Sequence, residues 1–85
     1  MKYKKKPVVI DAIQFTGNNN DDIIEFLGDD RQKITWSWDK KVILIPTLEG
    51  VVGCSLGNWI IRGVNGELYP CRDDIFRKTY DAIED

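Results

Sequence analysis

The side chains that most often perform catalysis or bind metal are scarce in this chain of 85 residues. It contains no histidine, which removes the commonest general base, the commonest metal ligand and every serine–histidine or cysteine–histidine pair. The two cysteines, Cys54 and Cys71, supply only half of the four ligands that a structural zinc site needs. We therefore expect no catalytic residue, no metal and no cofactor, and the sequence predicts a protein that is not an enzyme.

Adjacent aspartates and paired glycines are the remaining candidates for a metal or phosphate site. The aspartate pairs at 21–22, 29–30 and 73–74 fit helix starts and a loop, and the calcium-loop pattern Asp-x-Asn-x-Asn-Gly is absent. The glycines at 50 and 53 and at 63 and 66 lack the Lys-Ser/Thr ending of a phosphate-binding loop. Turns and helix ends therefore explain both sets better than ligand binding does.

The N-terminal segment is the best candidate for an electrostatic binding site. Four lysines and a tyrosine there could contact phosphates and stack on a base: Lys2, Tyr3, Lys4, Lys5 and Lys6. The alternative is that charges at the start of an edge strand prevent that strand from pairing with other chains. The net charge of −2 favours this alternative and disfavours nucleic acid as the partner.

The same segment bears on where the protein resides. The apolar run after the lysines is interrupted at Asp11, and it is too short and too polar for a signal peptide. No apolar run approaches the ~20 residues that cross a bilayer, so we expect no membrane partner. We therefore expect a cytoplasmic protein with free thiols at Cys54 and Cys71, with a single disulfide between strands as the alternative.

Aromatic residues are the best candidates for a protein-binding surface. Trp36 and Trp38 are two positions apart and so share one face of a predicted strand, and Trp59 begins another strand. Together with an arginine and a tyrosine of a predicted hairpin, they form the predicted partner-binding set: Trp36, Trp38, Trp59, Arg62 and Tyr69. The alternative is that the tryptophans form the core, because so small a chain needs large packing units.

The elements that must position these residues are mostly short strands. Residues rich in β-formers or alternating in polarity predict strands over 7–15, 33–39, 42–45, 51–54, 59–63 and 67–71. Residues 21–27 start with two aspartates and place apolar side chains at helical spacing before Gly28, so they predict a helix. Residues 72–76 predict a helical turn, and 77–83 fit either a helix or an edge strand, of which we favour the strand.

These elements predict a single domain, 1–85, of the α+β class. We expect a small bent antiparallel sheet or open barrel of about five to seven short strands, with one short helix in the N-terminal half packed over it. Asn65-Gly66 supplies the two positive-φ residues of a two-residue type I′ hairpin turn. That register places Arg62 opposite Tyr69 and within reach of Glu67, as an exposed cluster.

Four blocks that span most of the chain carry a resemblance to other proteins. They are residues 2–15, 47–50, 57–71 and 74–80, and the third reads Gly57-Asn-Trp-Ile-Ile-Arg-Gly-Val-Asn-Gly-Glu-Leu-Tyr-Pro-Cys71. The chain resembles a family of small uncharacterised phage and prophage proteins of Gram-positive bacteria. The resemblance implies a phage or prophage origin, and it implies no catalytic residue.

Two positions depart from the pattern of that family. Its members often carry aspartate where this chain has Asn58, and proline where it has Asp73. An amide at position 58 argues against acid chemistry there. An amide that accepts a turn hydrogen bond would preserve a structural role for Asn58.

Three functions follow from these observations, in order of preference. The first is a non-enzymatic accessory protein that binds a host or phage protein, or a second copy of itself as a homo-oligomer, through an exposed sheet face or edge. The second is a module that binds nucleic acid through the N-terminal lysines. The third is a protein that sequesters a nucleotide or another small ligand in a pocket among Arg62, Tyr69 and Arg72.

Overall fold

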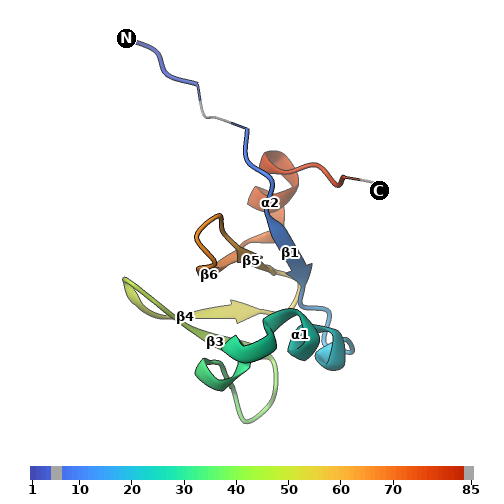
Figure 1. Cartoon of the computed structure of the whole chain (residues 1–85). Coiled ribbons are helices and arrows are strands. Elements are labelled where there is room, and N and C mark those ends of the chain that lie inside the picture. Colours follow the sequence, from blue (N-terminus) through green and yellow to red (C-terminus); the bar gives the residue numbers. More distant parts are fainter. Residues whose placement is uncertain (5–6, 84–85) are drawn as a thin grey trace.

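The computed structural model of the protein describes residues 1–4 and 7–83, which form two three-stranded antiparallel sheets and two α-helices (Figure 1). The first sheet has the order β1-β5-β6, with β1 at Asp11–Gln14, β5 at Trp59–Arg62 and β6 at Leu68–Cys71. The second sheet has the order β2-β3-β4, with β2 at Thr35–Trp36, β3 at Val42–Thr47 and β4 at Gly50–Ser55. The helices are α1 at Asn20–Leu27, the 3₁₀ helix η1 at Gly28–Lys33 and α2 at Asp73–Thr79.

The α+β class is confirmed, but the described strands form two three-stranded sheets and not one bent sheet of five to seven strands, and they close no barrel. The six strands of the described chain divide into two sheets after β4, where residues 55–58 form a turn and Gly57 has a φ of 89°. The N–H of Phe15 then donates to the carbonyl of Asn58 (2.8 Å), and the N–H of Gly57 donates to the carbonyl of Phe15 (2.7 Å). These two bonds start the pairing of β5 with β1, so the chain does not continue the second sheet.

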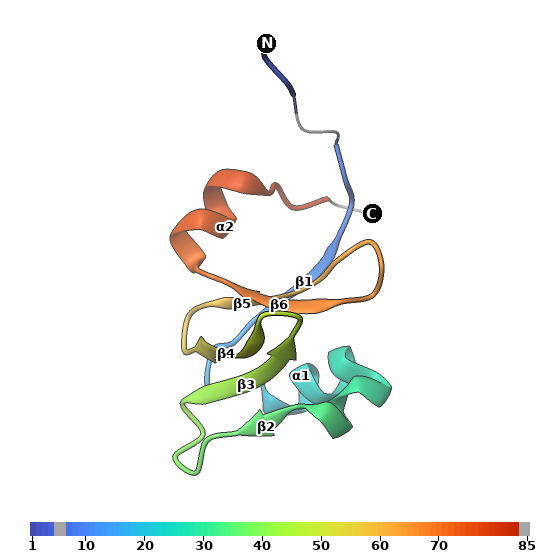
Figure 2. The ribbon, with the colours of Figure 1, turned by 90° about the vertical axis from the view of Figure 1, so that its left-hand side faces the viewer.

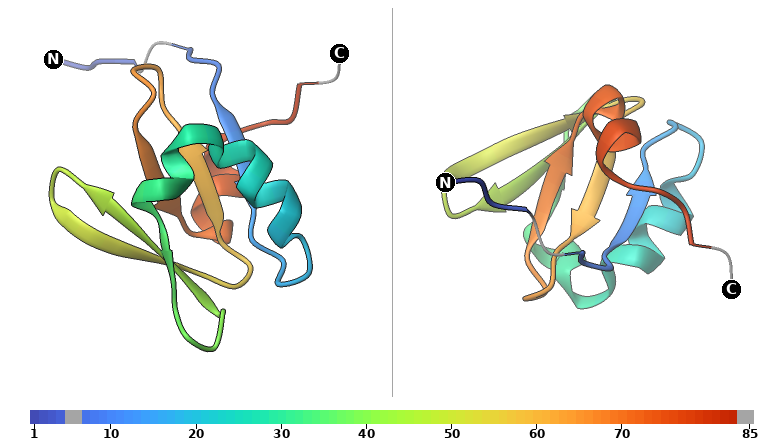
Figure 3. Two further views of the ribbon diagram at one scale, coloured as in Figure 1. Left: turned by 60° about the horizontal axis from the view of Figure 1, so that its bottom comes forward. Right: turned by 90° about the horizontal axis from the view of Figure 1, so that it is seen from above.

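The core lies between the two sheets and beneath α1. Figure 3 shows α1 lying across the first sheet, and the helix buries Ile23 and Leu27, as the predicted helix over 21–27 requires. The buried cluster is Phe15, Ile23, Leu27, Ile34, Ile43, Ile45, Cys54 and Ile60. Because side chains alternate along β5, Trp59 lies on the face of the first sheet opposite Ile60, and there it contacts α2.

The C-terminal segment differs from its prediction. The expected helical turn extends into α2, and no strand forms over residues 80–83. Two contacts explain the longer helix: Phe76 stacks on Trp59 with ring centroids 3.9 Å apart, and Arg77 pairs with Asp73 one helical turn away at 2.9 Å. The helix therefore covers the second face of the first sheet. The prediction of one short helix in the N-terminal half is incomplete, because α2 is a second helix.

The β5–β6 hairpin is one residue out of its predicted register. Arg62 pairs with Leu68 and not with Tyr69. The turn is also one residue longer than predicted: the N–H of Gly66 donates to the carbonyl of Gly63 (3.0 Å), and within this turn only Gly66 has a positive φ, of 81°. This is a type I turn followed by a left-handed glycine, and the predicted type I′ turn is wrong. As a result Arg62 and Tyr69 lie on opposite faces of the sheet, and the predicted exposed cluster does not form.

Candidate functional site

The three tryptophans of the predicted binding set lie in three different environments. Trp36 is half-buried and meets Phe15 edge-on, with ring centroids 5.6 Å apart, so it belongs to the core. Trp59 is half-buried against Phe76 in α2. Trp38 is 96% exposed at the turn between β2 and β3. Of the three, Trp38 is therefore the one whose ring is open to a partner.

Arg62 holds the end of α1 against the first sheet. Its guanidinium donates to the carboxylate of Asp30 (2.7 Å) and to the carbonyls of Phe26 (3.0 Å) and Leu27 (3.3 Å). It also lies 5.4 Å from the centroid of the Phe26 ring. The hydrogen bond from Arg62 lowers the pKa of Asp30 below its usual value, against the effect of burial. Most of its hydrogen-bonding capacity is thus directed to the helix end.

Asn58 and Asp73 form a second polar link, between β5 and α2. The side-chain oxygen of Asn58 accepts the N–H of Asp73 (3.1 Å), which satisfies one of the unpaired donors at the start of the helix. The carboxylate of Asp73 accepts the indole N–H of Trp59 (2.9 Å) and the Nε–H of Arg77 (2.9 Å), and both bonds lower its pKa. The amide oxygen of Asn58 thus accepts a hydrogen bond from the start of α2 rather than within a turn.

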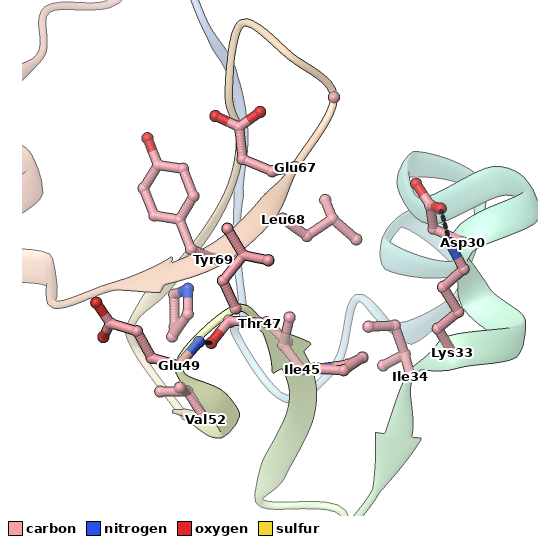
Figure 4. A pocket seen from close by; sticks show the side chains of 14 residues that line it. Asp30, Lys33, Ile34, Ile45, Thr47, Glu49, Val52, Glu67, Leu68 and Tyr69 are labelled. Atoms are coloured by element: carbon pink, nitrogen blue, oxygen red, sulfur yellow. Dashed lines mark hydrogen bonds and ion pairs between the residues drawn. The ribbon is translucent and has the colours of Figure 1, made fainter.

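β6 faces β3 and β4 across the gap between the two sheets (Figure 2), and an open groove lies there (Figure 4). It has a volume of about 600 Å³, and η1, β3, the β3–β4 turn, β4 and β6 contribute to its walls. We call it the inter-sheet groove. Its apolar lining is Ile34, Ile45, Pro46, Leu48, Val52, Leu68 and Pro70, and its other lining residues are Asp30, Lys33, Thr47, Glu49, Gly66, Glu67 and Tyr69.

The charges of this groove are mainly negative. Three carboxylates, on Asp30, Glu49 and Glu67, stand against the single ammonium of Lys33, which gives a formal charge of −2. Asp30 pairs with Arg62 (2.7 Å) and Lys33 (3.8 Å), and the carboxylate of Glu67 accepts the N–H of Asn65 (2.9 Å) within the hairpin turn. Among the described residues, Glu49 is therefore the acid of the groove whose carboxylate has neither an ion pair nor a hydrogen bond. A phosphate would be repelled here, whereas a partner with apolar and basic side chains would be attracted.

Only one of the three residues predicted to line a small-ligand pocket lies in this groove. Tyr69 lines it, whereas Arg62 points toward α1, and Arg72 pairs with Asp74 (3.0 Å) on the exposed surface. Burial raises the pKa of Tyr69 to about 12, with a further contribution from its hydrogen bond with Tyr80. Its phenol therefore stays protonated at neutral pH and can act as a neutral donor.

A second, smaller groove lies on the α2 side of the first sheet. It has a volume of about 440 Å³ and runs between residues 8–12 and 80–83, over Trp59 and Phe76. Val9 and Ile83 on its walls are 74% and 69% exposed, so these apolar residues are largely accessible. Of the residues predicted to bind a partner, Trp59 lies in this second groove and Tyr69 lines the inter-sheet groove.

The lysine-rich segment lies away from both grooves. Lys2, Tyr3 and Lys4 are exposed, and Figures 1 and 2 show the N-terminal residues extending from the body of the molecule. Lys5 and Lys6 lie outside the described residues. The described part of the segment therefore presents two lysines and one aromatic ring without a surrounding wall.

The two cysteines are free, as predicted. Cys54 is buried on β4 opposite Ile43, and Cys71 is half-buried on β6 opposite Trp59, so they belong to different sheets. Burial raises the pKa of Cys54 to about 11, and burial together with Asp74 also raises the pKa of Cys71. Both thiols are therefore protonated at neutral pH and are poor nucleophiles.

Three further observations delimit the site. Across residues 1–4 and 7–83, no cluster of three or more cysteine, aspartate or glutamate side chains is placed to hold a metal ion. None of the helices in that part of the chain has the length and apolar character that a bilayer crossing requires. No protein-family model, no curated protein and no solved structure matches the chain.

The inter-sheet groove is the feature that sequence reasoning missed. Its walls come from segments as far apart as Asp30 and Pro70, and they meet only because the strands form two sheets. The one available signal was proline in or next to two predicted strands: Pro70 lies within 67–71, and Pro46 directly follows 42–45. Proline is confined to edges and irregular positions of a sheet, where a side-chain site can open.

Proposed function

We propose that the protein is a phage or prophage accessory protein that binds another protein in the inter-sheet groove, without catalysis, in the host cytoplasm. The observation that carries the proposal is the apolar lining of this groove beneath an acidic rim. Its volume of about 600 Å³ lies within the ~300–1,000 Å³ of typical ligand sites. The resemblance of the sequence to phage and prophage proteins supports the genomic setting.

The partner is best described as a segment with apolar and basic side chains. Ile45 and Leu68 offer apolar contacts to the apolar side chains of such a segment, and Glu49 and Glu67 offer negative charge to its basic side chains. Pro70 has no N–H to offer along β6, so a segment that paired as an added strand would lose a backbone hydrogen bond there. The groove therefore favours capture of side chains over extension of the sheet.

A matched pair of variants on β4 tests the proposal. Val52 lines the groove and is 36% exposed, whereas its neighbour Val51 is 69% exposed and points to the other face of the strand. Val52→Arg fills the groove with a long cation, and Val51→Arg places the same side chain outside it. Both purified variants and the wild-type chain are used as bait in nuclease-treated host lysate, and recovered proteins are quantified by mass spectrometry.

We expect a partner that is recovered with the wild type and with Val51→Arg and is lost by at least about tenfold with Val52→Arg. Equal recovery with both variants would place the binding site elsewhere on the molecule. Recovery that nuclease abolishes would favour the N-terminal lysines and nucleic acid. Circular dichroism of each variant provides the control that the fold is retained.

A further inference from the structure

The turn between β2 and β3 exposes a large aromatic ring on an ordered backbone. We call residues 37–41 the Trp38 turn. Its carboxylate at Asp39 accepts the hydroxyl of Ser37 (2.7 Å) and the N–H of Lys41 (3.2 Å). The N–H of Ser37 donates to the carbonyl of Val42 (2.9 Å), and the N–H of Val42 donates back to the Ser37 hydroxyl (3.1 Å). These hydrogen bonds fix the backbone of the turn, from which the indole of Trp38 is 96% exposed.

Basic side chains accompany this ring. Lys40 and Lys41 are both exposed, and against them stands the single carboxylate of Asp39, which leaves the Trp38 turn with a formal charge of +1. The hydrogen bonds from Ser37 and Lys41 lower the pKa of Asp39, so its acceptor role persists at neutral pH. The turn is therefore an apolar side chain with flanking cations, the chemistry that the inter-sheet groove favours.

The Trp38 turn and the groove lie at opposite ends of the same strand. Val42, at one end of β3, follows the turn, and Thr47, at the other end, lines the groove. The two positions are about 17 Å apart along an extended strand, and Figure 1 shows the two loops of the second sheet at opposite ends of β3. The hydrogen-bonded turn cannot fold back over that distance, so Trp38 does not reach the groove of its own chain.

We propose that the inter-sheet groove receives the Trp38 turn of a second copy of this chain. The indole fills the apolar lining, and Lys40 and Lys41 face the free carboxylate of Glu49 and the nearby charge of Glu67, whose carboxylate accepts the N–H of Asn65. Complementary charge is the argument for this occupant: −2 on the lining residues, or −1 when Arg62, which pairs with Asp30, is counted, against +1 on the turn. The inference rests on the proposed function, since it requires the groove to bind protein, and it names the partner.

Reversal of the two charge sets provides the test. One variant carries Lys40→Glu and Lys41→Glu, and the other carries Glu49→Lys and Glu67→Lys. The full chain is examined by sedimentation velocity from about 10 µM to about 1 mM, because a contact made by one side chain is expected to be weak. Each variant alone should lose association, and an equimolar mixture should regain it, because every turn then meets a groove of opposite charge. Added salt should weaken the wild-type association.

Single substitutions separate the ring from the charges. Trp38→Ala should weaken association at least about tenfold, whereas Tyr3→Ala, which removes another exposed ring (86%), should leave it unchanged. Association that survives Trp38→Ala, or a charge-reversed mixture that stays monomeric, would overturn the proposal. A monomeric wild type would overturn it as well. If Val52→Arg still loses a lysate partner in that case, the protein-binding groove stands and only the second copy is excluded as its occupant.

Discussion

Replacement of Arg62 tests the link between α1 and the first sheet. Arg62→Met keeps an unbranched side chain but loses the guanidinium that lies 5.4 Å from the centroid of the Phe26 ring. It removes the charge and the donors that serve the Asp30 carboxylate and the carbonyls of Phe26 and Leu27. Because these acceptors belong to the end of α1 and to η1, their loss should loosen the helical layer from the sheet.

The size of the effect follows from the exposure of the pair. The side chains of Arg62 and Asp30 are 26% and 30% exposed, so the interaction is neither fully screened nor fully buried. Hydrogen bonds to charged groups contribute about 1.5–3 kcal/mol when buried, and exposed ion pairs contribute about 0.2–1 kcal/mol. We therefore expect Arg62→Met to lower the free energy of unfolding by about 2 kcal/mol. In a domain of this size that corresponds to a fall in Tm of about 8–16 °C.

Urea denaturation followed by circular dichroism measures the change. Arg72→Met is the matched control, because Arg72 and its partner Asp74 are 71% and 55% exposed, and it should cost less than about 0.5 kcal/mol. A double-mutant cycle with Asp30→Asn should give a coupling free energy of about 1 kcal/mol for the pair. If Arg62→Met unfolds within about 0.5 kcal/mol of the wild type, the anchoring role assigned to Arg62 is wrong.

Two further predictions concern titratable groups. Because the pKa of Asp30 is lowered in the folded state, its contribution is complete above the unfolded value near 3.8 and is lost as pH falls through the folded value. The urea midpoint of the wild type should therefore fall more steeply below about pH 4 than that of Asp30→Asn, and parallel curves would contradict this assignment. For the thiols, Ellman's reagent at pH 8 should react with the half-buried Cys71 well before the buried Cys54, whose pKa of about 11 keeps it protonated. Cys71→Ser should remove the faster phase, and two equal rates would refute the burial of Cys54.

Local sequence patterns were sufficient for α1 and for the positions of β3 to β6. The helix over 21–27 follows from apolar spacing and from Gly28, and the hairpin over 59–71 follows from its strands and central turn residues. The register of that hairpin was missed because Asn65-Gly66 fits two turns: a type I′ turn needs both residues at positive φ, whereas the observed turn needs only Gly66. One residue of difference was enough to separate Arg62 from Tyr69.

Contacts between distant segments explain the remaining errors. The division into two sheets depends on the pairing of β1 with β5, which joins residues nearly fifty positions apart and leaves no local signal. The extension of α2 depends on the stack of Phe76 on Trp59, while the local pattern of residues 77–83 fitted a strand equally well. Likewise the alternation in 33–39 placed Trp36 and Trp38 on one face, but β2 ends at Trp36 and the turn exposes Trp38. Periodicity predicts a face only as far as the strand continues.

Residues of η1 contribute both to the stability of the fold and to the wall of the inter-sheet groove. Asp30, Lys33 and Ile34 form one wall of the inter-sheet groove, and Figure 4 shows these three side chains facing Leu68 across it. The position of that wall depends on Arg62, which fixes Asp30 from the first sheet. Arg62 itself does not line the groove, so its replacement should weaken binding there only through movement of η1. A variant that keeps the fold but widens the groove would therefore separate the two properties, and Arg62→Lys, which retains the charge but not the planar set of donors, is the substitution to use.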